Sequence, residues 1–170
     1  MEVIDNFLPD DEFVLLRELL IGENSEFPGY CSPWVDYAGS GLDGEGELHN
    51  CQMFHWLLRP WDSAPSPFLT QVVGPIVKVL NSSYLYGAKA NLQFRSPSVV
   101  PMVFHKDVGE VQCRTVVFYV TGTDGPTVFA DGTEVQSVAN RALVFDSQLL
   151  HCSSTHTNSK VRCVVNVNCL

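Results

Sequence analysis

The sequence predicts a mainly β domain of the α+β class, in which amino-terminal helices support an antiparallel β sandwich or barrel. Apolar residues recur with helical spacing in two stretches before residue 82. After Tyr84, short runs of β-branched and aromatic residues alternate with turn residues. The 170 residues match the usual size of one domain. We therefore expect a single domain over 1–170, with helical support and a loop in 1–82 and a β core in 83–170.

A first helix is expected from Asp10 to about Gly22. Pro9 precedes it, and the next three residues are carboxylates, which the positive end of the helix dipole favours. Three apolar residues then follow with helical spacing: Phe13, Leu16 and Leu20. Residues 22–50 hold six glycines among polar residues and predict a long loop, and long loops inside compact domains are often lids or binding loops.

A second helix is expected from Ser66 to about Asn81. Ser66 is a suitable N-cap and Pro67 suits the first helical position. An apolar stripe follows, made of Phe68, Val72, Ile76, Val79 and Leu80. The Gly74-Pro75 pair predicts a kink or break within this helix.

Six strand-like runs follow, and turn residues separate them. Their ranges are 88–94, 100–107, 113–122, 126–138, 141–147 and 161–170. Asp131-Gly132 is the strongest hairpin signal in the chain. The result is a set of antiparallel strands in the second half of the molecule.

Composition and charge argue against several partners and locations. A formal net charge of −9 disfavours a nucleic-acid partner, because affinity for phosphates comes from clustered Lys and Arg. The first residues, MEVIDNFLPDDEF, carry acids where a signal peptide carries positive charge, and no stretch approaches the roughly 20 apolar residues of a membrane span. We expect a soluble, cytoplasmic monomer. The six cysteines show no CxxC spacing and are expected to be free thiols.

A possible metal site begins in the segment VFHKDVG, residues 103–109. In an extended chain His105 and Asp107 project to one side and Lys106 to the other. His151 follows the buried run ALVFDSQLL and offers a second imidazole. Two imidazoles and one carboxylate form the facial triad of non-heme Fe(II) oxygenases, although zinc also accepts such ligands.

Arg162 opens the last strand-like run, VRCVVNVNCL. A buried guanidinium normally requires a carboxylate partner, and no Asp or Glu lies near Arg162 in the sequence. A dicarboxylate ligand would supply that partner. Strand parity places Arg162, Val164 and Asn166 on one face and leaves open whether this face is buried or turned to solvent.

Together these residues resemble the Fe(II)/2-oxoglutarate-dependent dioxygenases, and within them the prolyl 4-hydroxylase-like branch, including small phage and bacterial members. The likeness rests on HKD, a distal histidine and an arginine about ten residues later. It also includes the opening VIDNFLPDDEF, the segment NLQFRSP and the stretch DGTEVQSVANRALVFDSQLLH. It implies a double-stranded β-helix, the distorted jelly roll of this family. If a phage encodes the chain, we expect the protein in the cytoplasm of the host.

The resemblance also implies a set of ligands and roles. Fe(II) would be held by His105, Asp107 and His151, 2-oxoglutarate and O2 would be cosubstrates, and ascorbate would be a supporting reductant. Arg162 would bind the far carboxylate of 2-oxoglutarate, with a hydroxyl from Tyr119. Polar residues on the same or adjoining strands would contact cosubstrate or substrate: Asn91, Gln93 and Asn166. The family more often has tyrosine on the first core strand.

The substrate is the least determined feature. The branch implies prolyl or other peptidyl hydroxylation, and a protein or peptide partner. The rival functions are the same chemistry on a nucleic-acid base or small metabolite, and a catalytically idle β sandwich that serves as a binding or virion component. Two further interpretations concern aromatic residues: His156 is expected in a solvated loop, and the aromatics around His55 (Phe54, Trp56 and Trp61) are expected in the core rather than at a substrate entrance.

Overall fold

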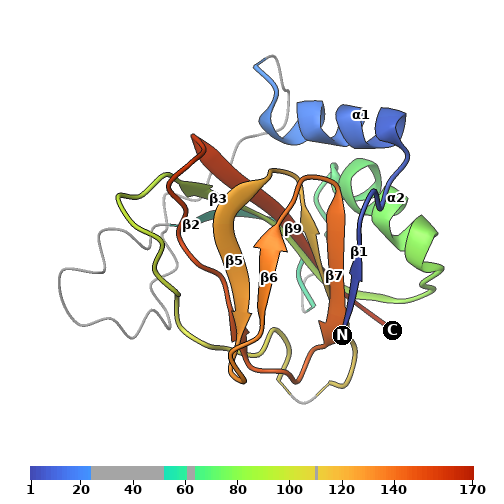
Figure 1. Ribbon diagram of the computed structural model, residues 1–170. Coiled ribbons are helices and arrows are strands. Elements are labelled where there is room, and N and C mark those ends of the chain that lie inside the picture. Colours follow the sequence, from blue (N-terminus) through green and yellow to red (C-terminus); the bar gives the residue numbers. More distant parts are fainter. Residues whose placement is uncertain (24–51, 61–63, 110) are drawn as a thin grey trace.

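The computed structural model describes residues 1–23, 52–60, 64–109 and 111–170 (Figure 1). Most of the predicted loop over 22–50, with its proposed lid role, and Trp61 lie outside these residues. None of the helices in the described parts is long and apolar enough to cross a membrane. The four described cysteines are all buried free thiols, which agrees with the expectation for them: Cys113, Cys152, Cys163 and Cys169.

The first helix, α1 (Asp10–Ile21), confirms its prediction, and the chain leaves the helix at Gly22. The second, α2 (Leu69–Leu80), begins three residues after Ser66. The Ser66 hydroxyl does accept a hydrogen bond from the Phe68 backbone N–H (3.2 Å), but the intervening residues form a turn. Of the kink or break predicted at Gly74-Pro75, the break does not occur, since one helix continues through Pro75. It ends at Asn81, which has a left-handed backbone (φ 49°).

The strands form two antiparallel sheets. The larger sheet has the order β1-β7-β4-β9-β3-β2. Its strands are β1 (Glu2–Ile4), β2 (Gln52–Leu58), β3 (Leu85–Phe94), β4 (Arg114–Tyr119), β7 (Arg141–Asp146) and β9 (Val161–Cys169). The smaller sheet has the order β6-β5-β8, from β5 (Thr123–Phe129), β6 (Glu134–Ser137) and β8 (His151–Cys152).

The two faces of the larger sheet pack against different layers. Figure 1 shows α1 and α2 beside the larger sheet, with β5 and β6 on its other side. The helix side buries a large apolar cluster that includes Leu16, Ile76 and Val165. The side between the sheets buries a smaller cluster that includes Phe145 and Val164. Two facing antiparallel sheets with this strand order make a double-stranded β-helix, as expected.

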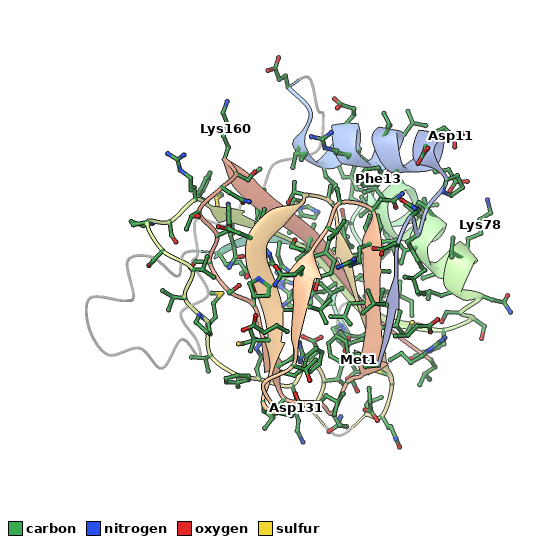
Figure 2. The ribbon with its side chains drawn as sticks, viewed as in Figure 1. Met1, Asp11, Phe13, Lys78, Asp131 and Lys160 are labelled. Atoms are coloured by element: carbon green, nitrogen blue, oxygen red, sulfur yellow. The ribbon has the colours of Figure 1, made fainter. Side chains whose placement is uncertain are left out.

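The β5–β6 hairpin confirms the signal at Asp131-Gly132. Gly132 has φ +87°, which glycine adopts without strain, and the Asp131 carboxylate accepts the Thr133 N–H at 2.9 Å. Figure 2 shows Asp131 at the tip of this hairpin.

One strand prediction is wrong, and three strands were not predicted. Residues 100–107 do not form a regular strand: only isolated bridges occur there, at Pro101 and His105, because Pro101 lacks the N–H that a ladder needs. The strands β1, β2 and β8 were not predicted. β1 and β2 lie at the edges of the larger sheet and β8, only two residues long, lies at an edge of the smaller one, where the sequence pattern is weak.

Candidate metal centre

Main-chain pairing brings the two candidate histidine ligands together. His105 and His151 exchange both backbone hydrogen bonds, with N to O distances of 2.9 and 3.1 Å. β8 is in turn paired with β5, so that His151 lies opposite Phe129. His151 therefore belongs to the smaller sheet, His105 is joined to it by an isolated bridge, and the two ring centroids are 4.8 Å apart.

Asp107 completes the cluster two residues later. The donor atoms of His105, Asp107 and His151 all lie within 4.8 Å of one another. Each histidine Nε2 is 3.6 Å from one oxygen of the Asp107 carboxylate. The His105 side chain is 47% exposed, whereas those of Asp107 and His151 are buried, so the cluster opens to solvent on the His105 side.

The orientation of both rings suits metal binding. Nδ1 of His105 is 3.1 Å from the Val103 carbonyl, and Nδ1 of His151 is 2.9 Å from the Leu149 carbonyl. A carbonyl only accepts, so Nδ1 carries the proton and Nε2 keeps its lone pair toward the cluster. Phe145 packs edge-on against the His151 ring at 4.7 Å and restricts its rotation.

Electrostatics keep the carboxylate charged. Burial alone raises the pKa of Asp107, but the contact with His105 and the charge of His151 outweigh it and hold the pKa at about 2. The carboxylate in turn raises the pKa of His105, whereas burial lowers that of His151. Asp107 Oδ2 is buried and has no hydrogen-bond partner among the described residues, which is the state expected of an oxygen reserved for a cation.

Arg162 faces the interior between the sheets, so the face of β9 that carries it is turned inward and not to solvent. It is 3% exposed, and its Nη1 donates to Gln93 Oε1 (3.1 Å) and Ser153 Oγ (2.7 Å). In the described parts of the chain its Nε has no hydrogen-bond partner, and none of the ion pairs there includes Arg162. Burial lowers the pKa of the guanidinium. A fully buried cation without a carboxylate is costly, so this site is suited to an anionic ligand.

A narrow cavity connects Arg162 with the histidines. Its volume is about 50 Å³, and its polar lining includes Lys89, Asn91, His105, His151, Arg162 and Asn166. Asn91 accepts a hydrogen bond from Gln52 (3.0 Å), while Asn166 Oδ1 is buried without a partner among the described residues.

Tyr119 and Gln93 lie beside Arg162 rather than in the cavity lining. The Tyr119 ring centroid is 5.8 Å from the guanidinium carbon, and its hydroxyl is 2.7 Å from Thr127 Oγ1. Burial raises the pKa of this phenol, so it remains a neutral hydrogen-bonding group. Gln93 accepts from Arg162 and so fixes the guanidinium instead of reaching the cavity itself.

Lys89 lines the cavity and was not predicted as a site residue. Register places it opposite Asn166 of β9, so it shares the interior face with Asn91 and Gln93. The period-two pattern of AKANLQF contains this signal, because Lys89 is two residues before Asn91.

Two interpretations of aromatic residues were wrong. His156 is fully buried, not solvated, since the loop carrying it packs beneath β5 at Gly125. Phe54 and Trp56 belong to neither buried cluster. They are half-buried, form an edge-to-face pair at 6.1 Å, and lie on the face of β2 that adjoins Asn91 and Lys89.

Known structures share this fold. No family model and no curated protein matches the sequence. A Pseudomonas putida prolyl-4-hydroxylase matches with a TM-score of 0.59 and 15% identity, covering 99% of this chain and 90% of that one. The viral collagen prolyl hydroxylase of Paramecium Bursaria Chlorella virus-1 matches with a TM-score of 0.56 and 15% identity, covering 99% of this chain and 87% of that one. SnoK, a non-heme alpha ketoglutarate dependent carbocyclase from nogalamycin biosynthesis, matches with a TM-score of 0.62 and 13% identity, covering 98% of this chain and 78% of that one. At these identities the similarity shows the fold, and the chemistry has to be argued from the site.

Proposed function

We propose that this protein is an Fe(II)- and 2-oxoglutarate-dependent dioxygenase that hydroxylates a C–H bond of a peptidyl, prolyl-type substrate and forms succinate and carbon dioxide. One observation carries the proposal. A buried arginine without a carboxylate partner among the described residues lies along the same narrow cavity as a His-Asp-His cluster. A metal cluster alone would fit zinc equally well, but the arginine indicates an anionic cosubstrate.

The three ligand residues fit a divalent metal in charge and in protonation. His105 and His151 present unprotonated Nε2 atoms, and Asp107 stays ionised because its pKa is about 2. Three protein ligands leave coordination positions open, and bound iron supplies oxygen activation at those positions. The two backbone carbonyls that hold the Nδ1 protons keep both rings aimed at the metal.

Arg162 would bind the far carboxylate of 2-oxoglutarate. Gln93 and Ser153 hold one arm of the guanidinium, and the remaining N–H groups are left to a ligand. The surrounding Tyr119 and Val164 are buried, so water is excluded and the charge pairing is strong. This arrangement binds and orients the cosubstrate without taking part in the oxidation.

The peptidyl substrate is supported by the fold of the prolyl hydroxylases and by the open His105 side of the site. The negative surface also tolerates a neutral or basic peptide.

The test is anaerobic addition of Fe(II) and 2-oxoglutarate to the purified protein. We expect the weak visible charge-transfer band of a keto acid chelated to iron, and we expect His151→Ala to abolish both the band and stoichiometric iron binding. His55→Ala is the matched control, because His55 contacts Ser66 outside the cavity (2.9 Å). No band in the wild-type protein, together with unchanged metal content in His151→Ala, would exclude the proposed function.

A further inference from the structure

Lys89 is a second cation of the candidate site, and the proposed binding of iron and 2-oxoglutarate does not account for it. It lies in the middle of β3, opposite Asn166 on β9 and Trp56 on β2. Its side chain lines the cavity that His105, His151 and Arg162 also line. From this lining position its positive charge acts to lower the pKa of both histidines and of Asp107, although the pKa of His105 stays raised because of Asp107.

Lys89 has no carboxylate partner among the described residues. Its ammonium lies 5.7 Å from the centroid of the Trp56 ring, and none of the ion pairs there includes it. A cation–π contact offsets only part of the cost of bringing an ammonium near a metal ion. The strand pairing on both sides of β3 prevents Lys89 from moving away as a flexible loop would.

With Fe(II) and 2-oxoglutarate bound, the charged groups of the cavity would sum to one excess positive charge. The protein supplies Lys89 and Arg162 as cations against the single carboxylate of Asp107. Fe(II) and the dianion of 2-oxoglutarate cancel each other. One more negative group would neutralise the site, and in a confined cavity such a group is bound strongly.

Lys89 and Arg162 serve different anions. Asn166, opposite Lys89, lies four residues along β9 from Arg162, which corresponds to roughly 13 Å of strand. The far carboxylate of 2-oxoglutarate at Arg162 therefore leaves Lys89 free for another ligand.

We propose that Lys89 binds a carboxylate of the substrate, so that the substrate is an acid whose carboxylate lies beside the C–H bond to be oxidised. This inference rests on the proposed function. Asn166 refines the chemistry, because its Oδ1 is buried without a described partner and requires an N–H donor. A carboxylate next to an N–H group occurs in a free amino acid and in the carboxyl-terminal residue of a peptide.

The experiment measures binding, not turnover. The anaerobic complex of the protein with Fe(II) and 2-oxoglutarate is titrated calorimetrically with the common L-amino acids and their amides. Acetylated Gly-Gly-X peptides with free or amidated carboxyl termini form the second arm, where X is each common residue. We expect the best probe to bind at least about tenfold more tightly as the acid than as the amide, because a charged hydrogen bond is lost in the amide. The arm that contains this probe identifies the source of the carboxylate.

Two variants and a control assign the effect to Lys89. Lys89→Met should reduce the difference between acid and amide to less than about threefold while 2-oxoglutarate affinity stays within about twofold, and Lys89→Arg should retain most of the difference. Lys160→Met removes a positive charge from an exposed side chain that projects from the end of the sandwich (Figure 2) and should change neither affinity.

Three outcomes would overturn the inference: no acid binds better than its amide, the preference survives in Lys89→Met, or Lys89→Met weakens 2-oxoglutarate as much as the probe. In the last case Lys89 serves the cosubstrate. Failure of the wild-type protein to bind Fe(II) and 2-oxoglutarate at all would instead remove the proposed function, and the inference with it.

Discussion

Arg162 and Gln93 are direct partners across β9 and β3, and the guanidinium Nη1 donates a hydrogen bond to Gln93 Oε1 over 3.1 Å. The neutral amide orients the cation without neutralising it. Arg162 is therefore held in position and has no carboxylate partner within the described ranges, as a binding site for an anion requires.

Arg162→Met should weaken 2-oxoglutarate by about 100-fold or more, because a buried charged pair contributes several kcal/mol to binding. Iron affinity should change by less than about threefold, since Arg162 does not belong to the metal cluster. Calorimetry with each ligand separately measures both affinities. Arg141→Met, which removes a half-buried guanidinium paired with Asp5 away from the cavity, is the control for a general loss of charge. Equal loss of both affinities in Arg162→Met would contradict the role of Arg162.

The same variant should leave the ligand-free protein at least as stable as the wild type. Replacing a buried unpaired cation with a thioether of similar length removes a desolvation cost of order 1 kcal/mol or more. Urea unfolding without metal or cosubstrate measures this. A large loss of stability would show that the bonds to Gln93 and Ser153 outweigh the cost of burying the charge.

Asn140→Ala should destabilise the protein by about 2–4 kcal/mol. Asn140 has a left-handed backbone (φ 60°), and its buried side chain accepts from the Leu8 N–H (2.9 Å) and donates to the Leu8 carbonyl (2.8 Å). Alanine strains the backbone and leaves both Leu8 groups unpaired. Asn81→Ala is the matched control, because Asn81 shares the backbone conformation but is exposed, and should cost only about 1 kcal/mol. Equal losses in urea unfolding would refute the role of the side chain.

Gly125→Ala should cost about 2–3 kcal/mol in urea unfolding. A Cβ at this position would meet the Thr155 carbonyl and come within 3.1 Å of the His156 Cβ, so the segment after β8 would have to move. At Gly109 an added Cβ meets nothing within 4 Å, and Gly109→Ala should change stability by less than about 0.5 kcal/mol. A neutral Gly125→Ala would mean that this segment adjusts freely.

His156 should make stability fall in mild acid. Burial, aided by the nearby charge of Arg162, lowers its pKa below the ordinary value of 6.5. Below that value the unfolded chain binds a proton that the folded protein does not, so the free energy of unfolding decreases as the pH falls. The loss is at most about 1.4 kcal/mol per pH unit and continues until the folded-state pKa is reached.

His156→Gln should remove this part of the pH dependence. Urea unfolding of the metal-free wild type and variant, between about pH 7.5 and pH 5.5, measures the difference between their slopes. His55 and His151 also have a lowered pKa and remain in both proteins, so the difference isolates His156. Parallel stability curves would show that His156 is not the group responsible.

Local pattern was enough to predict most of the elements. Helical spacing located α1 and α2, and the β-branched runs located β3, β4, β7 and β9, because each carries its own apolar face. Predictions failed where pairing comes from distant neighbours. The edge strands β1, β2 and β8 were missed, and the segment ending at His105 is joined to its neighbours only by isolated bridges.

By itself the sequence predicted an antiparallel β sandwich or barrel and its candidate residues: an HxD pair, a distal histidine and an arginine on the last strand. The double-stranded β-helix was implied by the resemblance that these residues carry. Only the tertiary structure decided which face of β9 is buried, and therefore that Arg162 is a buried cation without an ion-pair partner in the described parts of the chain. It also brought Lys89 into the same cavity and buried His156. The physical reason is that a strand's period of two defines two faces but not which of them meets the other sheet, and that choice depends on long-range packing.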